Sequence, residues 1–297
     1  MRLPWLCFIC PFAALRGLVW SGLVLGVVSG RSAADPLPAA PRPVVASSLT
    51  AVDPVPGPRP AAAVTISGSV GSAGPLGSAV PSSYLASVVA ELEKAWPRNR
   101  TVNIVCHGHS VPAGYFKTPV VDSVNAYPAG LHQKLKVRFP LAVINVIVTA
   151  IGGENSVKGA ARFERDVLSH RPDVVCIDYG LNDRASGLAS ARAAWVAMIE
   201  SARAAGVKVI LLSPTADTKA RVEDPLDPLN QHAAQIRQLA TDYRTGLVDS
   251  LGLFHAELRR GARLEDLMSH SNHPNARGHA LVALALLDWF PVTVSAP

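Results

Sequence analysis

Short apolar runs rich in valine and isoleucine alternate with segments of helical periodicity, and this alternation constrains the fold more than any other feature. The runs predict strands at residues 101–105, 141–149, 173–179, 207–212 and 246–249. The periodic segments predict helices at residues 85–96, 128–139, 156–169, 188–205, 229–243 and 275–289. Strands that alternate with such helices favour a parallel sheet covered by helices on both faces. The run 141–149 is mostly apolar and rich in valine and isoleucine, which predicts a strand buried on both faces.

The N-terminal part of the chain differs in composition from the rest. Residues 1–34 combine basic residues with two apolar runs and end in small residues, which is the pattern of an export signal. The alternative is an uncleaved membrane anchor, although Pro11 and Arg16 interrupt the apolar runs. Residues 35–81 are rich in proline, alanine, glycine and serine, which indicates an extended tether. We therefore expect a secreted or periplasmic protein with a folded domain at residues 82–297, which contacts a membrane only if the leader is retained.

The charge distribution bears on binding of nucleic acid, and the positions of the cysteines bear on disulfide formation. The net charge is +6 over 297 residues, and lysine and arginine are scattered rather than gathered in blocks. This distribution indicates a solvated surface and argues against binding of nucleic acid. Of the four cysteines, Cys7 and Cys10 lie in the leader. Cys106 and Cys176 lie in predicted strands, where we expect two buried free thiols.

Residues suited to catalysis follow the predicted strands directly. Ser110, Gly153, Asn182 and Pro214 each come just after a strand end. In parallel α/β sheets, ligands bind at the carboxyl ends of the strands, so these residues are expected on one rim. Ser110 also follows a glycine that breaks its strand, and such a turn presents a serine hydroxyl and its N–H to a cleft.

Four short motifs in order resemble those of the SGNH/GDSL hydrolase superfamily, over roughly residues 100–290. They are Gly108-His109-Ser110, Gly153-Glu154, Gly180-Leu181-Asn182-Asp183 and His270-Ser271-Asn272-His273-Pro274-Asn275, followed by Gly278-His279. The resemblance implies a three-layer α/β/α flavodoxin-like fold with about five parallel strands. It also implies a serine esterase that requires no cofactor and no metal.

The resemblance assigns roles by position. Ser110 would be the nucleophile and His273 the general base, so that an ester is hydrolysed through an acyl-serine intermediate. The N–H groups of Ser110 and Gly153 and the side-chain amide of Asn182 would form the oxyanion hole. The implied substrates are O-acetyl groups on carbohydrates, or lipid and other small esters, and the export signal favours the glycan esters.

Two positions depart from the family pattern. The usual aspartate before the nucleophile is His109, and the usual triad acid three residues before the general base is His270. Loss of that carboxylate costs about 10⁴-fold in turnover in the serine proteases, so the change matters. Three alternatives stay open: a backbone carbonyl or an acid from elsewhere orients His273, His270 does so itself, or the domain is catalytically weak or dead. The acids considered are Asp183, Asp217 and Asp266. We expect a working Ser–His pair with a substitute orienting group.

Four residues beside the motifs are candidate auxiliary groups: His109, Asp183, Arg184 and His270. Asp183 is expected to cap the segment that follows it. Arg184 either binds an anionic substrate group or forms a surface ion pair. Two alternative functions remain. One is a non-catalytic glycan-binding module, and the other is a metal-dependent hydrolase in which His109, His270 and His273 bind zinc.

Overall fold

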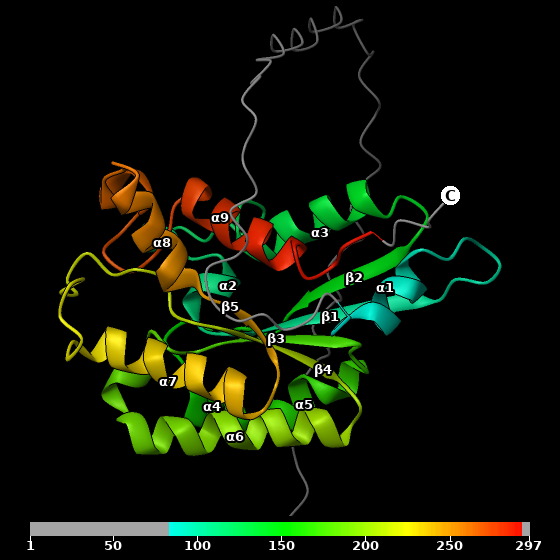
Figure 1. Cartoon of the computed structure of the whole chain (residues 1–297), viewed down its shortest axis with the longest axis horizontal. Helices are drawn as coiled ribbons and strands as arrows, with labels where there is room; N and C mark the ends of the chain where they lie inside the picture. The colour runs from blue at the N-terminus through cyan, green and yellow to red at the C-terminus, as the bar shows by residue number, and fades with distance from the viewer. Residues whose placement is uncertain (1–82, 293–297) are drawn as a thin grey trace, which may run out of the picture. The chain divides into compact units, whose positions relative to one another are not determined.

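Five parallel strands form one sheet within residues 83–292, the part of the chain that the computed structural model describes (Figure 1). Their order across the sheet is β2-β1-β3-β4-β5. The strands are β1 (Thr101–Gly108), β2 (Val143–Val148), β3 (Val174–Asp178), β4 (Lys208–Leu212) and β5 (Gly246–Val248). The predicted parallel α/β sheet is thus confirmed. The export signal predicted at residues 1–34 and the tether at 35–81 lie outside the described residues.

Helices cover both faces of the sheet. One layer contains α1 (Ala86–Leu92), α3 (Tyr127–Arg138), α8 (Ser250–Arg259) and α9 (Ala276–Leu287), with the short α2 (Ser110–Ala113). The other contains α4 (Ser156–Ala161), α5 (Phe163–Asp166), α6 (Leu188–Ala204) and α7 (Pro228–Asp242). Between residues 83 and 292, no helix combines the length and the apolar character needed to cross a membrane.

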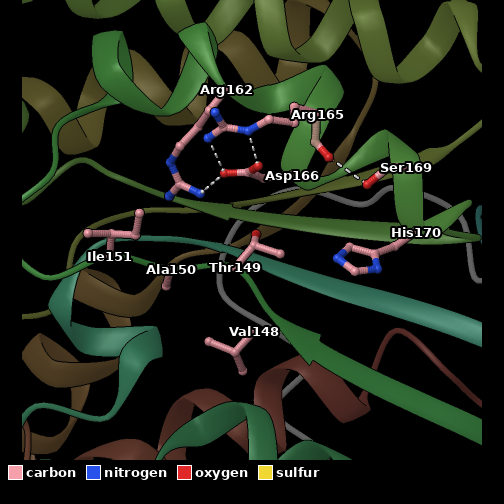
Figure 2. Close-up of a pocket in the computed structure, with 9 residues that line it drawn as sticks. All are labelled: Val148, Thr149, Ala150, Ile151, Arg162, Arg165, Asp166, Ser169 and His170. Carbon is pink, nitrogen blue, oxygen red and sulfur yellow. Dashed lines mark hydrogen bonds and ion pairs between the residues drawn. The ribbon is translucent and has the colours of Figure 1, made fainter. Parts of the chain in front are cut away.

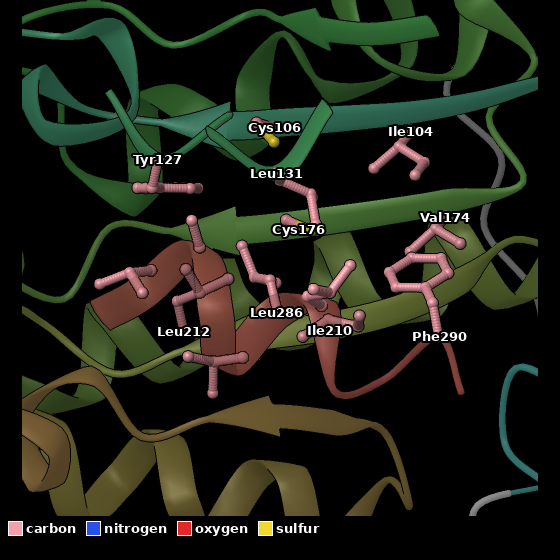
Figure 3. Close-up of a cluster of buried hydrophobic side chains, with 14 of the residues drawn as sticks. Ile104, Cys106, Tyr127, Leu131, Val174, Cys176, Ile210, Leu212, Leu286 and Phe290 are labelled. Carbon is pink, nitrogen blue, oxygen red and sulfur yellow. The ribbon is translucent and has the colours of Figure 1, made fainter. Parts of the chain in front are cut away.

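Alternating side chains of the central strands fill the two cores. On β1, Ile104 and Cys106 face the core beneath α3 and α9 (Figure 3). Val105 faces the opposite core. This period of two is the expected consequence of strand geometry. Cys106 lies opposite Cys176 of β3 in the sheet register, and both are buried and free of disulfides, as predicted.

The prediction that residues 141–149 form a strand buried on both faces is wrong. The strand is β2, at the edge of the sheet. Ile144 is buried, but Val143 and Val148 are 48% and 44% exposed. An apolar run does not reveal whether a strand is central or at an edge, because that depends on which strands pair.

The segment 156–169, predicted as one helix, is interrupted. It forms α4, α5 and a 3-10 turn at Leu168–His170. Asn155, rather than Ser156, caps α4: its side-chain oxygen accepts a hydrogen bond from the Lys158 N–H at 3.1 Å. The interruption lies at Arg162, whose backbone leaves helical geometry and whose side chain turns inward to bond acidic partners.

Two further helix predictions need correction. The first helix ends at Leu92, and Trp96, predicted on its apolar face, is 84% exposed. The residue before a proline is disfavoured in the helical region, which fits an end to the helix ahead of Pro97. Helix α8 was not predicted; the Asp249 side chain caps it by accepting a hydrogen bond from the Gly252 N–H.

Candidate active site

Ser110 lies on a tight turn that joins β1 to α2. Gly108 ends β1, and a Cβ atom there would collide with the backbone oxygen of Asp178 on β3, so glycine permits the close approach. The backbone N–H of His109 donates to that same oxygen at 3.2 Å. The His109 Nδ1 atom accepts a hydrogen bond from the Val111 N–H at 3.1 Å and so caps α2. Ser110 is thereby fixed as the first residue of α2.

His273 approaches Ser110 from the C-terminal end of the domain. Its Nε2 atom lies 2.9 Å from Ser110 Oγ. The loop that carries it is held by Ser269, whose hydroxyl donates to the His273 carbonyl at 3.1 Å. Asn275 then caps α9 by accepting the N–H groups of its first turn. The two residues predicted as nucleophile and base are therefore within hydrogen-bond reach of each other.

A backbone carbonyl orients the His273 ring. The Nδ1 atom lies 2.8 Å from the oxygen of Phe116. A carbonyl oxygen only accepts hydrogen bonds, so Nδ1 must carry the ring hydrogen. Nε2 of the neutral ring then has no hydrogen and accepts from the Ser110 hydroxyl. This is the tautomer that a general base requires.

The other orienting groups considered from the sequence are engaged elsewhere. The ring of His270 lies 6.0 Å from that of His273 between centroids, and its Nδ1 atom is 3.4 Å from Ser271 Oγ. The three acids have other partners: Asp266 pairs with Arg263, Asp217 with Arg184, and Asp183 with Trp195.

The surroundings of His273 favour its neutral form. Burial lowers the pKa of the imidazole, and the neighbouring His270 lowers it further, whereas the hydrogen bond to Phe116 acts in the opposite direction. The net shift is downward from the usual histidine value. The ring is therefore unprotonated, and able to accept a proton, at pH 7.

The three predicted oxyanion donors follow adjacent strands of the sheet. Ser110 follows β1, Gly153 follows the edge strand β2, and Asn182 follows β3. The connection after β1 leads to one side of that strand, and the connection after β2 leads back to β3 on its other side. The strand order therefore reverses between β1 and β3, which is where ligands bind in such sheets. Hydrogen bonds join the loops, since the Ile151 N–H donates to the Gly108 oxygen at 3.0 Å.

Each predicted donor retains a hydrogen for an oxyanion. Gly153 has a φ of +79°, a conformation that side chains disfavour. Within residues 83–292, the backbone N–H groups of Ser110 and Gly153 donate to no protein acceptor. Asn182 donates one amide hydrogen to the Glu154 oxygen at 2.8 Å, which leaves the second hydrogen of Nδ2. Their role as oxyanion donors stays a prediction.

A buried polar network holds the loop to which Asn182 is bonded. Arg162 donates two hydrogen bonds, of 2.6 and 2.9 Å, to the Glu154 carboxylate. It also donates to the hydroxyl of Tyr179 at 3.1 Å, which in turn lies 3.1 Å from His107 Nε2. Burial lowers the pKa of His107 to about 4, so this ring is neutral. Sequence reasoning assigned no role to Arg162 or Tyr179.

The two remaining auxiliary candidates have structural partners. The buried Asp183 accepts the Ser156 N–H and the Trp195 Nε1–H, both at 2.7 Å. The prediction that Asp183 caps its own following segment is therefore wrong, because its carboxylate instead joins the first residue of α4 to the middle of α6. Arg184 lies 2.8 Å from the buried carboxylate of Asp217, and this agrees with the ion-pair alternative.

No group of metal-binding side chains occurs in the described range 83–292. The three histidines suggested as a zinc site have other geometry. His109 is fully buried and accepts a backbone N–H, while both nitrogens of His273 bond to Phe116 and Ser110. His270 faces Ser271.

A cavity of about 500 Å³ lies beside the end of β2 and does not include Ser110 or His273 (Figure 2). Its charged groups pair with one another: Arg162 and Arg165 bond to the two oxygens of Asp166 at 3.1 and 2.5 Å. The lining residues are Val148, Thr149, Ala150, Ile151, Arg162, Arg165, Asp166, Ser169 and His170.

A model of the GDSL-like lipase/acylhydrolase family matches residues 106–281 of the chain. Among curated protein sequences, none matches. An acetylxylan esterase from Geobacillus stearothermophilus has a similar structure, with a TM-score of 0.56 and 22% identity over 64% of this chain and 94% of that one. A two-domain esterase active on acetylated mannans, crystallised with mannopentaose, gives a TM-score of 0.58 and 22% identity over 69% of this chain and 52% of that one. At these identities the likeness shows a shared fold.

Proposed function

The chain belongs to the GDSL-like lipase/acylhydrolase family, the SGNH type of esterase, and on that premise we propose that it hydrolyses esters through an acyl-serine intermediate. The observation that carries the proposal is the contact of 2.9 Å between His273 Nε2 and Ser110 Oγ, with Nδ1 of the same ring bonded to Phe116. An unprotonated nitrogen aimed at a serine hydroxyl is the arrangement of an activated nucleophile.

In the first half-reaction, Ser110 Oγ attacks the ester carbonyl while its proton passes to His273 Nε2. The negative charge moves to the carbonyl oxygen, where the N–H groups of Ser110 and Gly153 and the Asn182 amide stabilise it. Collapse of this intermediate breaks the ester C–O bond, and the leaving alcohol takes the proton from Nε2. Water then attacks the acyl-serine by the same steps, which releases the acid and restores Ser110.

The Phe116 carbonyl supplies part of what a triad carboxylate supplies. It fixes the tautomer and the direction of the His273 ring. It carries a partial rather than a full negative charge, so it stabilises the imidazolium less. We therefore expect a functional enzyme with a base weaker than that of a complete triad.

We propose O-acetyl groups on carbohydrates as the substrates and an exported location for the enzyme. Two observations support the substrate class: the family is one of acylhydrolases, and proteins with the same fold act on acetylated xylan and mannan. The proposal of export rests on the sequence pattern of residues 1–34.

Labelling with a fluorophosphonate probe tests the activated nucleophile. We expect the chain to be labelled, Ser110→Ala and His273→Ala to abolish labelling, and both to lower turnover of an aryl acetate at least ~10³-fold. Ser201→Ala, at an exposed position on α6, is the matched control and should label normally. A folded protein without labelling would contradict the esterase and favour a glycan-binding module.

A further inference from the structure

Two buried polar residues close to the nucleophile have no role in the proposed ester hydrolysis. His109 precedes Ser110, and Asp178 is the last residue of β3. His109 Nε2 lies 3.4 Å from Asp178 Oδ1. Within the described residues, neither of these two buried atoms has a hydrogen-bond partner by ordinary criteria. The second carboxylate oxygen, Oδ2, accepts from the Tyr127 hydroxyl at 3.3 Å.

The hydrogen bond of Val111 determines which nitrogen of His109 carries a hydrogen. The Val111 N–H donates to His109 Nδ1, so Nδ1 has no hydrogen. Burial lowers the pKa of His109 to about 3, so the ring is neutral at pH 7. Its single hydrogen must therefore be on Nε2, the nitrogen that lies 3.4 Å from Asp178 Oδ1.

The contact is a polar contact of 3.4 Å between two buried atoms that have no other partner within the described residues, and it is not an ion pair. Because His109 is neutral, it contributes no positive charge to balance the carboxylate. Burial raises the pKa of Asp178 to about 7, although the hydrogen bond that the Tyr127 hydroxyl donates to Oδ2 acts in the opposite direction. Because Oδ2 faces Tyr127, Oδ1 is the carboxyl oxygen that faces His109 Nε2–H.

We infer that Asp178 is a positioning residue: it selects the Nε2–H tautomer of His109, and this tautomer caps α2 and aims the Ser110 hydroxyl and N–H. The inference rests on the proposed role of Ser110. If the ring hydrogen were on Nδ1, this nitrogen could not accept from the Val111 N–H, and two hydrogen-bond donors would face each other. The first turn of α2 would then shift, and a displacement of the reacting atoms by about 1 Å costs on the order of 10²-fold in rate.

The tautomer of His109 is measured first, without reference to activity. Long-range ¹H–¹⁵N correlation spectra of the ¹⁵N-histidine-labelled protein, assigned with H109N, should show Nε2–H across neutral pH. Asp178→Ala should broaden the His109 signals or move them toward the other tautomer. A hydrogen on Nδ1 in the wild type, or an unchanged tautomer in D178A, would overturn the inference. Because turnover plays no part, this result stands whether or not the chain is an esterase.

Kinetics of isosteric and truncating variants test the consequence for catalysis. In Asp178→Asn, the amide oxygen accepts from His109 and the amide nitrogen faces Tyr127, so we expect kcat within about threefold of wild type. Asp178→Ala should lower kcat about 10–100-fold with little change in KM. Val175→Ala, a buried truncation on the same strand that points into the opposite core, is the control for general destabilisation. Equal losses in D178A and V175A would mean a structural role only.

In a double-mutant cycle with His109→Asp, we expect the effect of Asp178→Asn to change sign. H109D keeps an acceptor for the Val111 N–H but buries a second carboxylate beside Asp178, where like charges repel. D178N should therefore be neutral or slightly harmful next to His109, yet should raise the kcat and melting temperature of H109D. Additive effects of the two substitutions would refute the pairing.

Discussion

The two ring nitrogens of His273 have different tasks, and the division follows from what lies beside each. Nδ1 faces a group that only accepts, and Nε2 faces a hydroxyl that can donate. Neither nitrogen faces a carboxylate. The basicity of this ring therefore depends on burial, on the hydrogen bond to Phe116 and on the neighbouring His270.

At this residue scale, the acid limb of the pH–rate profile reports His273. The base must be unprotonated, so kcat/KM should rise with pH through an apparent pKa below the usual histidine value of about 6.5. His270→Gln removes one cause of the lowered pKa, and the limb should move to higher pH. His132→Gln, on α3, is the control and should leave the limb in place. A shift in the opposite direction in H270Q would contradict this reading.

The element that carries the orienting carbonyl is a short hairpin-like loop after α2. Tyr115 bridges Val121 across the loop, and the Asp122 N–H donates to the Gly114 oxygen at 2.7 Å. The Tyr115 N–H donates to the Ser110 oxygen at 3.0 Å, and this hydrogen bond joins the loop to α2. The orientation of His273 thus depends on the docking of a loop that is 157 positions away in sequence.

At the element scale, Gly114→Ala should displace this loop, so that it no longer orients His273. Gly114 has a φ of +90°, and an added Cβ atom would lie 2.7 Å from the backbone of Ser123. We expect kcat to fall about 10–10³-fold, since the Phe116 carbonyl moves away from His273. Gly261→Ala is the matched control, because its φ is +93° and its Cβ would meet nothing within 4 Å. Equal kcat values in the two variants, measured with an aryl acetate, would show that the loop does not orient the base.

At the scale of the whole molecule, the parallel sheet both gathers the site and buries Asp178 inside it. Strands β2, β1 and β3 end side by side, so the three predicted oxyanion donors, which are far apart in sequence, follow neighbouring strands. The same arrangement places the Asp178 carboxyl among buried side chains, and this burial raises its pKa to about 7.

Stability should consequently fall with rising pH because of this one group. An unfolded aspartate has a pKa of about 3.9, so between that value and about 7 the folded state holds a proton that the unfolded state has lost. The contribution is fully present below about pH 4 and is lost as pH rises to about 7. Relative to D178N, which does not titrate, the free energy of unfolding should drop by on the order of 1–4 kcal/mol across this window. Urea titrations at several pH values measure the difference, and a constant gap would refute it.

Several features of the fold were predictable because they are local. The stretches 173–179 and 207–212 carry their strand pattern in their own residues, and helix 188–205 ends at Gly206, whose φ is +73°. The predictions were wrong where contacts with other parts of the fold determine the structure. The edge position of β2, the inward turn of Arg162 and the cross-link from Asp183 to Trp195 depend on neighbours remote in sequence.

The sequence by itself determined the alternation of strands and helices. It placed Ser110, Gly153 and Asn182 in motifs that follow strand ends, and His273 in a motif near the C-terminal end of the domain. Those are properties of residue type and spacing. Only the tertiary structure decided what orients His273 and what lies behind Ser110. A backbone carbonyl belongs to every residue, so no side chain marks Phe116 for its role. Likewise, His109 and Asp178 meet only because β1 and β3 pair in this register, with Gly108 opposite Asp178.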